Sequence, residues 1–148
     1  MGGVMNRGQL LLVLGGLALI IGALLPWATL TSFLVGSFSR AGYEGDGIIT
    51  GGIGILLLFG GLLVKGKPGK LYSLAGSFFA LIAGLILVSD FSNVSGIVRD
   101  MDAEESMMAS IGPGLYLSAL GAVLALVGGL QRVPAAPVPA LQPTAPAP

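Results

Sequence analysis

Four long runs of apolar residues dominate the sequence. They cover about residues 10–27, 47–64, 71–89 and 111–130, and no Asp, Glu, Lys or Arg lies inside them. Apolar residues occupy every face of each run, so the 3.6-residue repeat of a half-buried helix is absent. Because about 20 apolar residues in a helix cross the roughly 30 Å hydrocarbon core of a bilayer, the pattern predicts four membrane-spanning helices.

The composition changes the expected solvent from water to lipid. Hydrophobic residues make up 54% of the chain and charged residues only 9%, with a mean hydropathy of +0.93. Soluble domains carry about 25% charged residues. We therefore expect an all-α membrane protein in which residues 1–132 form a bundle of four transmembrane helices. A cleaved signal peptide is the weaker interpretation of the first run, since the residues around Pro26 make a poor cleavage site.

The distribution of charge predicts the orientation of the bundle. If all four runs span, five of the seven basic residues lie on one side: Arg7, Lys65, Lys67, Lys70 and Arg132. Arg40 and Arg99 lie on the other side, together with all seven acidic residues. Basic residues are enriched on the cytoplasmic side, so both termini are predicted to be cytoplasmic. No organelle address is found, and the expected location is the plasma (inner) membrane.

Residues 28–46, on the external side, predict a short β-hairpin because β-branched and aromatic residues lie on both sides of Gly36 and Ser37. Residues 133–148, on the cytoplasmic side, are rich in Pro and Ala and contain too few branched or aromatic residues for a core. We expect this second segment to be a disordered cytoplasmic tail.

A further external segment, residues 90–110, carries four acids close together: Asp100, Asp102, Glu104 and Glu105. The segment predicts a short interfacial helix with Asp102 or Ser106 as its start signal. Carboxylates also bind divalent cations, but this spacing does not match the twelve-residue calcium loop with its central glycine. We therefore expect a solvated acidic surface and no metal site.

Small residues inside the runs predict how the helices pack. The chain has 25 glycines, and small residues recur at four-residue spacing in the second, third and fourth runs. The predicted packing set is Gly47, Gly51, Gly76, Ala80, Gly84, Gly114, Ser118, Ala122, Gly121, Ala125 and Gly129. Lipid supplies no hydrophobic force between helices, so association relies on such smooth faces. The set serves packing within the bundle or self-association, and we favour packing within the bundle.

Polar residues at the ends of the runs have structural interpretations. Asp46 precedes the second run, where a carboxylate caps the free N–H groups of a helix. Trp27 closes the first run, as expected of an anchor at the membrane interface. Asp90 follows the third run, at the unfavourable helix end for an acid, and we expect it to pair with Arg40 or Arg99.

The residue types available exclude several kinds of chemistry. The chain contains no Cys and no His, which excludes thiol nucleophiles, Ser-His-Asp triads and the commonest metal ligands. Without ionisable residues in the runs, a proton-coupled transporter is not expected. Four hydroxyl residues inside the runs are expected to bond to the backbone of their own helix: Thr50, Ser73, Ser77 and Ser118.

Short motifs at the ends of the runs resemble a known group of proteins. They are Leu25-Pro26-Trp27, Glu44-Gly45-Asp46-Gly47-Ile48-Ile49 and Gly112-Pro113-Gly114-Leu115-Tyr116-Leu117. With these motifs the chain, from about Leu10 to Leu130, resembles the small glycine-rich four-span membrane proteins of unknown function found in bacteria and archaea. That resemblance implies the four-span plan and no activity. The plan is also loosely similar to that of claudins, but the paired cysteines of their first external loop are absent.

Together these features predict an integral membrane structural or interaction protein that lies in the lipid bilayer. It either self-associates or serves as an accessory subunit of a larger membrane complex. The alternative is an oligomeric channel or transport component for a small solute or lipid, although the runs have no polar lining. An enzyme is not expected, since it would require Asp46 and Asp90 to converge on a lipid headgroup at the outer surface. Neither a cofactor nor a nucleic-acid partner is expected.

Overall fold

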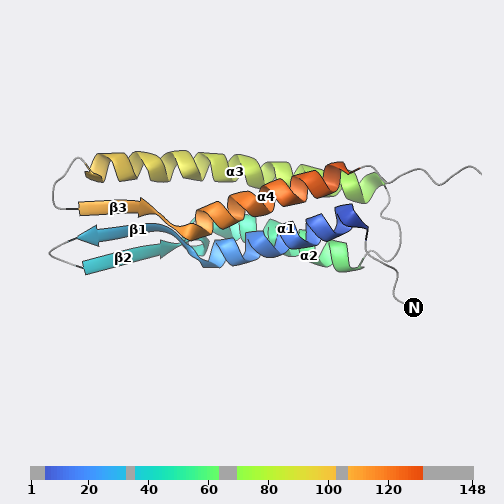
Figure 1. Cartoon of the computed structure of the whole chain (residues 1–148), viewed down its shortest axis with the longest axis horizontal. Coiled ribbons are helices and arrows are strands. Elements are labelled where there is room, and N and C mark those ends of the chain that lie inside the picture. The colour runs from blue at the N-terminus through green and yellow to red at the C-terminus, as the bar shows by residue number, and fades with distance from the viewer. Residues whose placement is uncertain (1–5, 33–35, 64–69, 103–106, 132–148) are drawn as a thin grey trace, which may run out of the picture.

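A computed structural model of the chain describes residues 6–32, 36–63, 70–102 and 107–131. Its helices are α1 (Arg7–Leu24), α2 (Gly47–Leu63), α3 (Lys70–Asp102) and α4 (Pro113–Leu130), with a short 3-10 helix η1 (Gly42–Glu44). Its strands are β1 (Pro26–Ser32), β2 (Gly36–Ala41) and β3 (Met107–Ile111). Figure 1 shows the strands at one end of the helices. The predicted tail, residues 133–148, lies outside the described residues.

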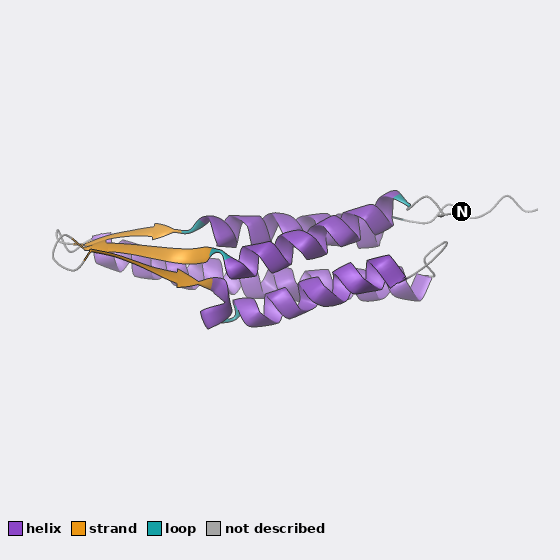
Figure 2. Ribbon diagram, turned by 90° about the horizontal axis from the view of Figure 1, so that it is seen from below, coloured by secondary structure: helices purple, strands orange, loops and turns teal. Residues whose placement is uncertain are grey.

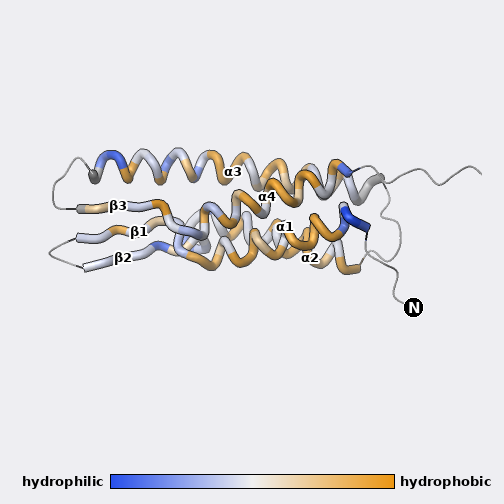
Figure 3. Tube along the Cα trace, viewed as in Figure 1, coloured by the Kyte–Doolittle hydropathy of each residue, from blue (hydrophilic) through white to orange (hydrophobic). Residues whose placement is uncertain are grey.

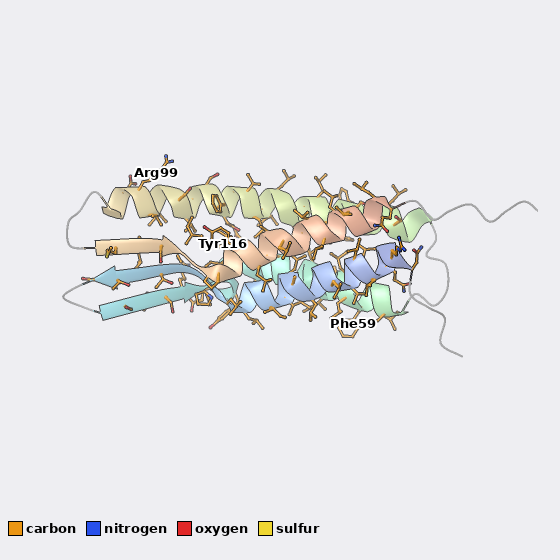
Figure 4. All side chains as sticks on the ribbon, in the orientation of Figure 1. Phe59, Arg99 and Tyr116 are labelled. Atoms are coloured by element: carbon orange, nitrogen blue, oxygen red, sulfur yellow. The ribbon has the colours of Figure 1, made fainter. Side chains whose placement is uncertain are left out.

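The four helices lie side by side along the long axis of the molecule (Figure 1 and Figure 2). α1 packs against both α2 and α4, and α3 packs mainly against α4. Apolar side chains fill the interior between them, including Leu12, Leu19, Leu57 and Leu115. Many other large apolar side chains face outward, as Phe59 does in Figure 4. An outer surface of this kind is typical of a protein surrounded by lipid.

By length and composition, α1, α3 and α4 are long and apolar enough to cross a membrane. α2 is also apolar but has 17 residues, which is the lower limit for a span. The ends of the predicted runs differ from the helix ends where the chain enters the sheet. Pro26 and Trp27 belong to β1, and Ile111 belongs to β3. α4 begins at Pro113, a favourable residue for the first helical position because its missing N–H needs no partner there.

The largest difference from the sequence prediction concerns α3. The predicted span ended at Ser89, but α3 has 33 residues and continues past Asp90 to Asp102. Hydrophilic residues lie along this outer half in Figure 3. The predicted interfacial helix starting at Asp102 or Ser106 is therefore wrong, because α3 ends at Asp102 and a strand begins at Met107. Hydropathy marks where lipid ends, whereas a helix continues into water as long as its backbone hydrogen bonds are made.

The predicted hairpin is present, and it is part of a larger sheet. β1 and β2 pair antiparallel, with Leu30 opposite Phe38. Gly36 starts β2 with a φ of +87°, which residues with a Cβ rarely adopt. β3 pairs with the other side of β1, with Leu30 opposite Ala109, so the strand order is β2-β1-β3. The all-α prediction with a lone hairpin is corrected to a helical protein with a three-stranded antiparallel sheet.

The part of α3 beyond Asp90 explains why Met107–Ile111 forms a third strand. α3 and β3 are in contact and lie beside each other in Figure 1. A two-stranded hairpin is only marginally stable in water, and a third strand packed on a helix supplies the missing support. β2 forms the opposite edge of the sheet, where its side chains are mostly exposed. The sheet thus extends the bundle at the end where α1 and α4 meet it.

Candidate functional site

Glycines of the predicted packing set bring α1 and α4 into backbone contact. A Cβ atom added at Gly121 would lie 2.8 Å from the carbonyl oxygen of Gly15. One added at Gly114 would lie 2.7 Å from the carbonyl oxygen of Gly22. Neither approach leaves room for a side chain, so main-chain atoms close the seam between the two helices. No space for a solute remains between them at these levels.

Most other members of the packing set also lie inside the chain. Cβ atoms added to four of the glycines would each meet a neighbouring segment within 3.1 Å: Gly47, Gly51, Gly76 and Gly129. The other small residues of the set are buried, namely Ala80, Ala122, Ala125 and Ser118. The structure therefore brings these positions to contacts within one chain.

Gly84 is the exception, because a Cβ atom added there would meet nothing within 4 Å. It lies in an apolar groove of about 290 Å³ between α3 and α4, with Val88 and Ala119 in the walls. The rings of Phe91 and Tyr116 form the outer end of this groove, with their centroids 6.2 Å apart and edge to face. Figure 4 shows Tyr116 between the two helices. We call this feature the α3–α4 groove.

A second cavity, of about 230 Å³, lies where the helices meet the sheet. Its wall includes Trp27, Arg40, Asp46, Asp90 and Asn93, which come from β1, β2, the start of α2 and α3. Asp90 is 9% exposed, and its Oδ2 atom has no hydrogen-bond partner among the described residues. Asp46 and Asp90 line the same cavity, and the carboxyl group of Asp46 is close enough to interact with that of Asp90. The two acids therefore converge, as the enzyme hypothesis required.

The structure corrects the expected ion pairing of Asp90 with an arginine. Arg40 instead pairs with Glu44, with 3.9 Å between Nε and Oε2, and its Nη2 donates a hydrogen bond to the Glu44 carbonyl oxygen at 3.1 Å. Arg99 lies further along α3 and points away from the sheet in Figure 4. Asp90 faces Asp46 because the packing of α2 against α3 brings the start of α2 to this level.

Trp27 and Asp46 were predicted to be an interface anchor and a helix cap. Trp27 is 6% exposed, and its Nε1 donates to the carbonyl oxygen of Gly22 at 2.8 Å. The ring thus packs inside the junction between helices and sheet and does not turn outward. The Asp46 carbonyl oxygen accepts a hydrogen bond from Thr50 Oγ1 at 3.2 Å, while its carboxyl group faces Asp90. A capping role for that carboxyl group remains a prediction.

The hydroxyl residues inside the helices differ in their partners. Thr50 bonds to the backbone one turn earlier in its own segment, and Ser77 Oγ donates to the Ser73 carbonyl oxygen at 3.1 Å. Both follow the sequence expectation. Ser118 does not, because its buried Oγ has no hydrogen-bond partner among the described residues. It lies at the closed seam, against Gly22.

Hydrogen bonds between helices are a feature that the sequence reasoning missed. Ser73 Oγ of α3 donates to the carbonyl oxygen of Gly129 in α4. Gln9 is 5% exposed, and its Nε2 donates to the carbonyl oxygen of Gly61 in α2. Both residues lie near the end of the bundle opposite the sheet. The sequence did show a polar residue near the end of an apolar run in each case. It could not show the bonding partner of that residue, because the partner depends on how the helices pack against one another.

Comparison with known proteins adds no family to this description. Neither a protein-family model nor a curated protein matches the sequence. The resemblance to glycine-rich four-span proteins therefore stays an expectation from short motifs. Within the described ranges, no group of three or more His, Cys, Asp or Glu side chains is placed to hold a metal ion. Glu104 and Glu105 of the acidic segment lie outside those ranges.

Proposed function

We propose that this chain is an integral membrane interaction protein whose α3–α4 groove receives a transmembrane helix of a second copy or of another membrane protein. The open surface at Gly84 carries the proposal. In lipid, helices associate through small residues that let their backbones approach closely. The other glycines of the packing set already meet neighbouring segments, whereas Gly84 is open and shares an apolar groove with Ala119. This combination suits a partner helix.

The proposal includes a placement in the plasma (inner) membrane, with four spans and both termini cytoplasmic. The 17 residues of α2 correspond to about 25 Å of helix, slightly less than the hydrocarbon thickness. α2 packs alongside α1, which is long enough to span, so both helices share the same depth. The excess of basic residues in the sequence at the start of α1, between α2 and α3 and after α4 supports cytoplasmic termini.

An oligomeric channel or transport component is the alternative function, and the geometry supports it less. Main-chain atoms close the α1–α4 seam, and many of the large side chains that face outward from the helices are apolar. A pathway for a polar solute requires polar groups along its length. Among the described residues, the polar cavity at Asp90 lies at the sheet end and not along the bundle.

The convergence of Asp46 and Asp90 does not lead us to propose an enzyme. The wall of their cavity contains no hydroxyl, thiol or imidazole side chain among the described residues. Two facing carboxyl groups are sufficient for binding a positively charged group. We therefore treat this cavity as a binding site.

Filling the α3–α4 groove tests the proposed function. Gly84→Leu adds a side chain where nothing lies within 4 Å, so the fold of the single chain is expected to tolerate it. Gly52→Leu is the matched control, because Gly52 on α2 is equally open and lies outside the groove. Each protein is gently extracted from native membranes, and its mass and co-purifying chains are measured by native mass spectrometry.

We expect a stoichiometric complex for the wild type and for Gly52→Leu, and its loss for Gly84→Leu. A complex of identical chains indicates self-association, and a second protein of defined stoichiometry indicates an accessory subunit. A wild type that is monomeric under these conditions contradicts the proposal. So does a complex that survives Gly84→Leu with unchanged mass.

A further inference from the structure

The cavity at the junction of helices and sheet contains a buried acceptor without a donor. Asp90 is 9% exposed, and its Oδ2 atom has no hydrogen-bond partner among the described residues. A buried acceptor without a donor is costly, so such an atom points to a donor from outside the chain. The adjoining cavity of about 230 Å³ has room for that group.

The wall of this cavity offers more acceptors than free donors. Asp46 contributes a second carboxyl group close to that of Asp90, and Asn93 adds a side-chain amide. Arg40 also lines the cavity, but its guanidinium group is engaged by Glu44 and its side chain is 66% exposed at the rim. The inner part of the cavity is therefore suited to a positively charged hydrogen-bond donor.

A primary ammonium group has this chemistry. It carries one positive charge and three N–H donors, and it has no acceptor that would need a partner. A calcium ion takes six or more oxygen ligands, and no group of three acids is placed for one within the described ranges. A quaternary ammonium group has no N–H to donate to the Oδ2 atom of Asp90. The unpartnered oxygen thus distinguishes a primary from a quaternary amine.

The position of the cavity favours a lipid as the source of the ammonium group. Its lining residues come from the junction of the helices and the sheet. In Figure 3 the apolar helices give way to a more hydrophilic sheet end, and this junction is the level of the headgroups under the four-span plan. Trp27 is among the residues that line the cavity, and aromatic side chains attract cations. Arg40 at the rim carries the charge that a phosphate group attracts.

We propose that this cavity binds the primary ammonium group of an aminophospholipid headgroup. Asp90 and Asp46 accept hydrogen bonds from the ammonium group, and Arg40 faces the phosphate group. The proposal rests on the membrane placement given above, but it does not depend on the α3–α4 groove. It assigns the lipid a binding position on the outer leaflet side of the bundle.

Lipid selectivity of the full-length chain tests this proposal. The protein is equilibrated with micelles that contain equal amounts of phosphatidylethanolamine, phosphatidylcholine and phosphatidylglycerol with identical acyl chains. Native mass spectrometry then counts the lipids that each protein retains. The fluorescence of Trp27, the single tryptophan, follows binding independently. We expect phosphatidylethanolamine to be preferred over phosphatidylcholine by about tenfold, as one charge-assisted hydrogen bond provides.

Two variants and a matched control connect the selectivity to the cavity. Asp90→Asn removes the charge with little change in shape, and Asp46→Asn does the same on the facing side. Asp100→Asn is the control, because Asp100 is exposed on the same helix as Asp90 and lies outside the cavity. We expect both cavity variants to lose the preference and the control to keep it. The selectivity of the wild type is informative even if one variant fails to fold.

Equal retention of phosphatidylethanolamine and phosphatidylcholine by the wild type overturns the proposal. A preference that both cavity variants keep overturns it as well. Free ethanolamine is the probe for a soluble source of the amine: if it changes Trp27 fluorescence as effectively as the lipid does, the assignment to a lipid is wrong. Asp90→Asn is expected to leave the oligomeric mass unchanged, so a failure here is distinguishable from a failure of the α3–α4 groove.

Discussion

Gly15 and Gly121 hold α1 and α4 at a separation that only glycine permits. A Cβ atom added at Gly15 would lie 2.6 Å from the carbonyl oxygen of Gly121, and one added at Gly121 would lie 2.8 Å from the carbonyl oxygen of Gly15. The relationship is reciprocal, and the atoms that a side chain would meet belong to the backbone. Close approach of this kind supplies much of the attraction between helices in lipid.

Gly15→Ala is expected to lower the free energy of unfolding by about 1–3 kcal/mol, because backbone atoms cannot move aside for the added methyl group. Chemical unfolding in detergent, followed by circular dichroism, measures the change. Gly52→Ala is the control: nothing lies within 4 Å of its added Cβ atom, so its stability is expected to equal or slightly exceed that of the wild type. Equal stability of both variants contradicts the closed seam.

The single tryptophan reports on the junction between helices and sheet. Because Trp27 is 6% exposed, its emission is expected to be blue-shifted and poorly quenched by acrylamide. Trp27→Phe removes the hydrogen bond to the Gly22 carbonyl oxygen and leaves that oxygen buried, which is expected to cost about 1–3 kcal/mol of stability. Emission typical of a water-exposed indole contradicts the burial of this ring in the junction.

The register of the third strand is testable by cross-linking, because the chain has no Cys of its own. Thr29 lies opposite Ser110, whereas Ala109 lies opposite Leu30 and its side chain is on the other face of the sheet. The double variant Thr29→Cys/Ser110→Cys is expected to form a disulfide under mild oxidation, and Thr29→Cys/Ala109→Cys is not. Gel mobility with and without reductant distinguishes the two outcomes. The reverse result indicates a register shifted by one residue.

The proposed orientation predicts opposite labelling of the two ends of the bundle. Ser37 is exposed in β2, and Gln131 is exposed directly after α4. In intact cells, Ser37→Cys is expected to react with a membrane-impermeant maleimide, and Gln131→Cys is expected to react only after permeabilisation. The cysteine-free wild type serves as the background control. Reaction of Gln131→Cys in intact cells means that the orientation is inverted or that the number of spans is odd.

Asp90→Asn is expected to raise the free energy of unfolding by about 1 kcal/mol in detergent without an added aminophospholipid. The amide removes a buried acidic group that has no donor at Oδ2, and its NH2 donates to the facing Asp46. Thermal unfolding measures the difference. Asp100→Asn, which changes an exposed residue of the same helix, is expected to leave the stability unchanged. A large loss of stability for Asp90→Asn means that the carboxylate has a structural partner.

Hydropathy was sufficient to predict the apolar parts of the four helices. Uncharged runs of about 20 residues favour helices in lipid, because every backbone hydrogen bond must be made within the segment. The hairpin was also predictable, since β-branched and aromatic residues surround Gly36, whose φ of +87° suits a glycine. Four-residue spacing likewise identified small residues such as Gly121 that lie in helix contacts.

Only the tertiary structure decided three features: the third strand, the full length of α3, and the proximity of Asp46 and Asp90. Met107–Ile111 becomes a strand because β1 offers it an edge and α3 lies beside it, and the pairing with β1 joins segments that are distant in the chain. Asp90 marked the end of an apolar run, yet its surroundings depend on where α2 docks against α3. Local patterns report what each segment needs from its solvent. Which segments meet depends on the packing of parts that are far apart in the chain. That packing brings Asp90 close to Asp46 and leaves Gly84 without a neighbour, and neither result can be read from a local pattern.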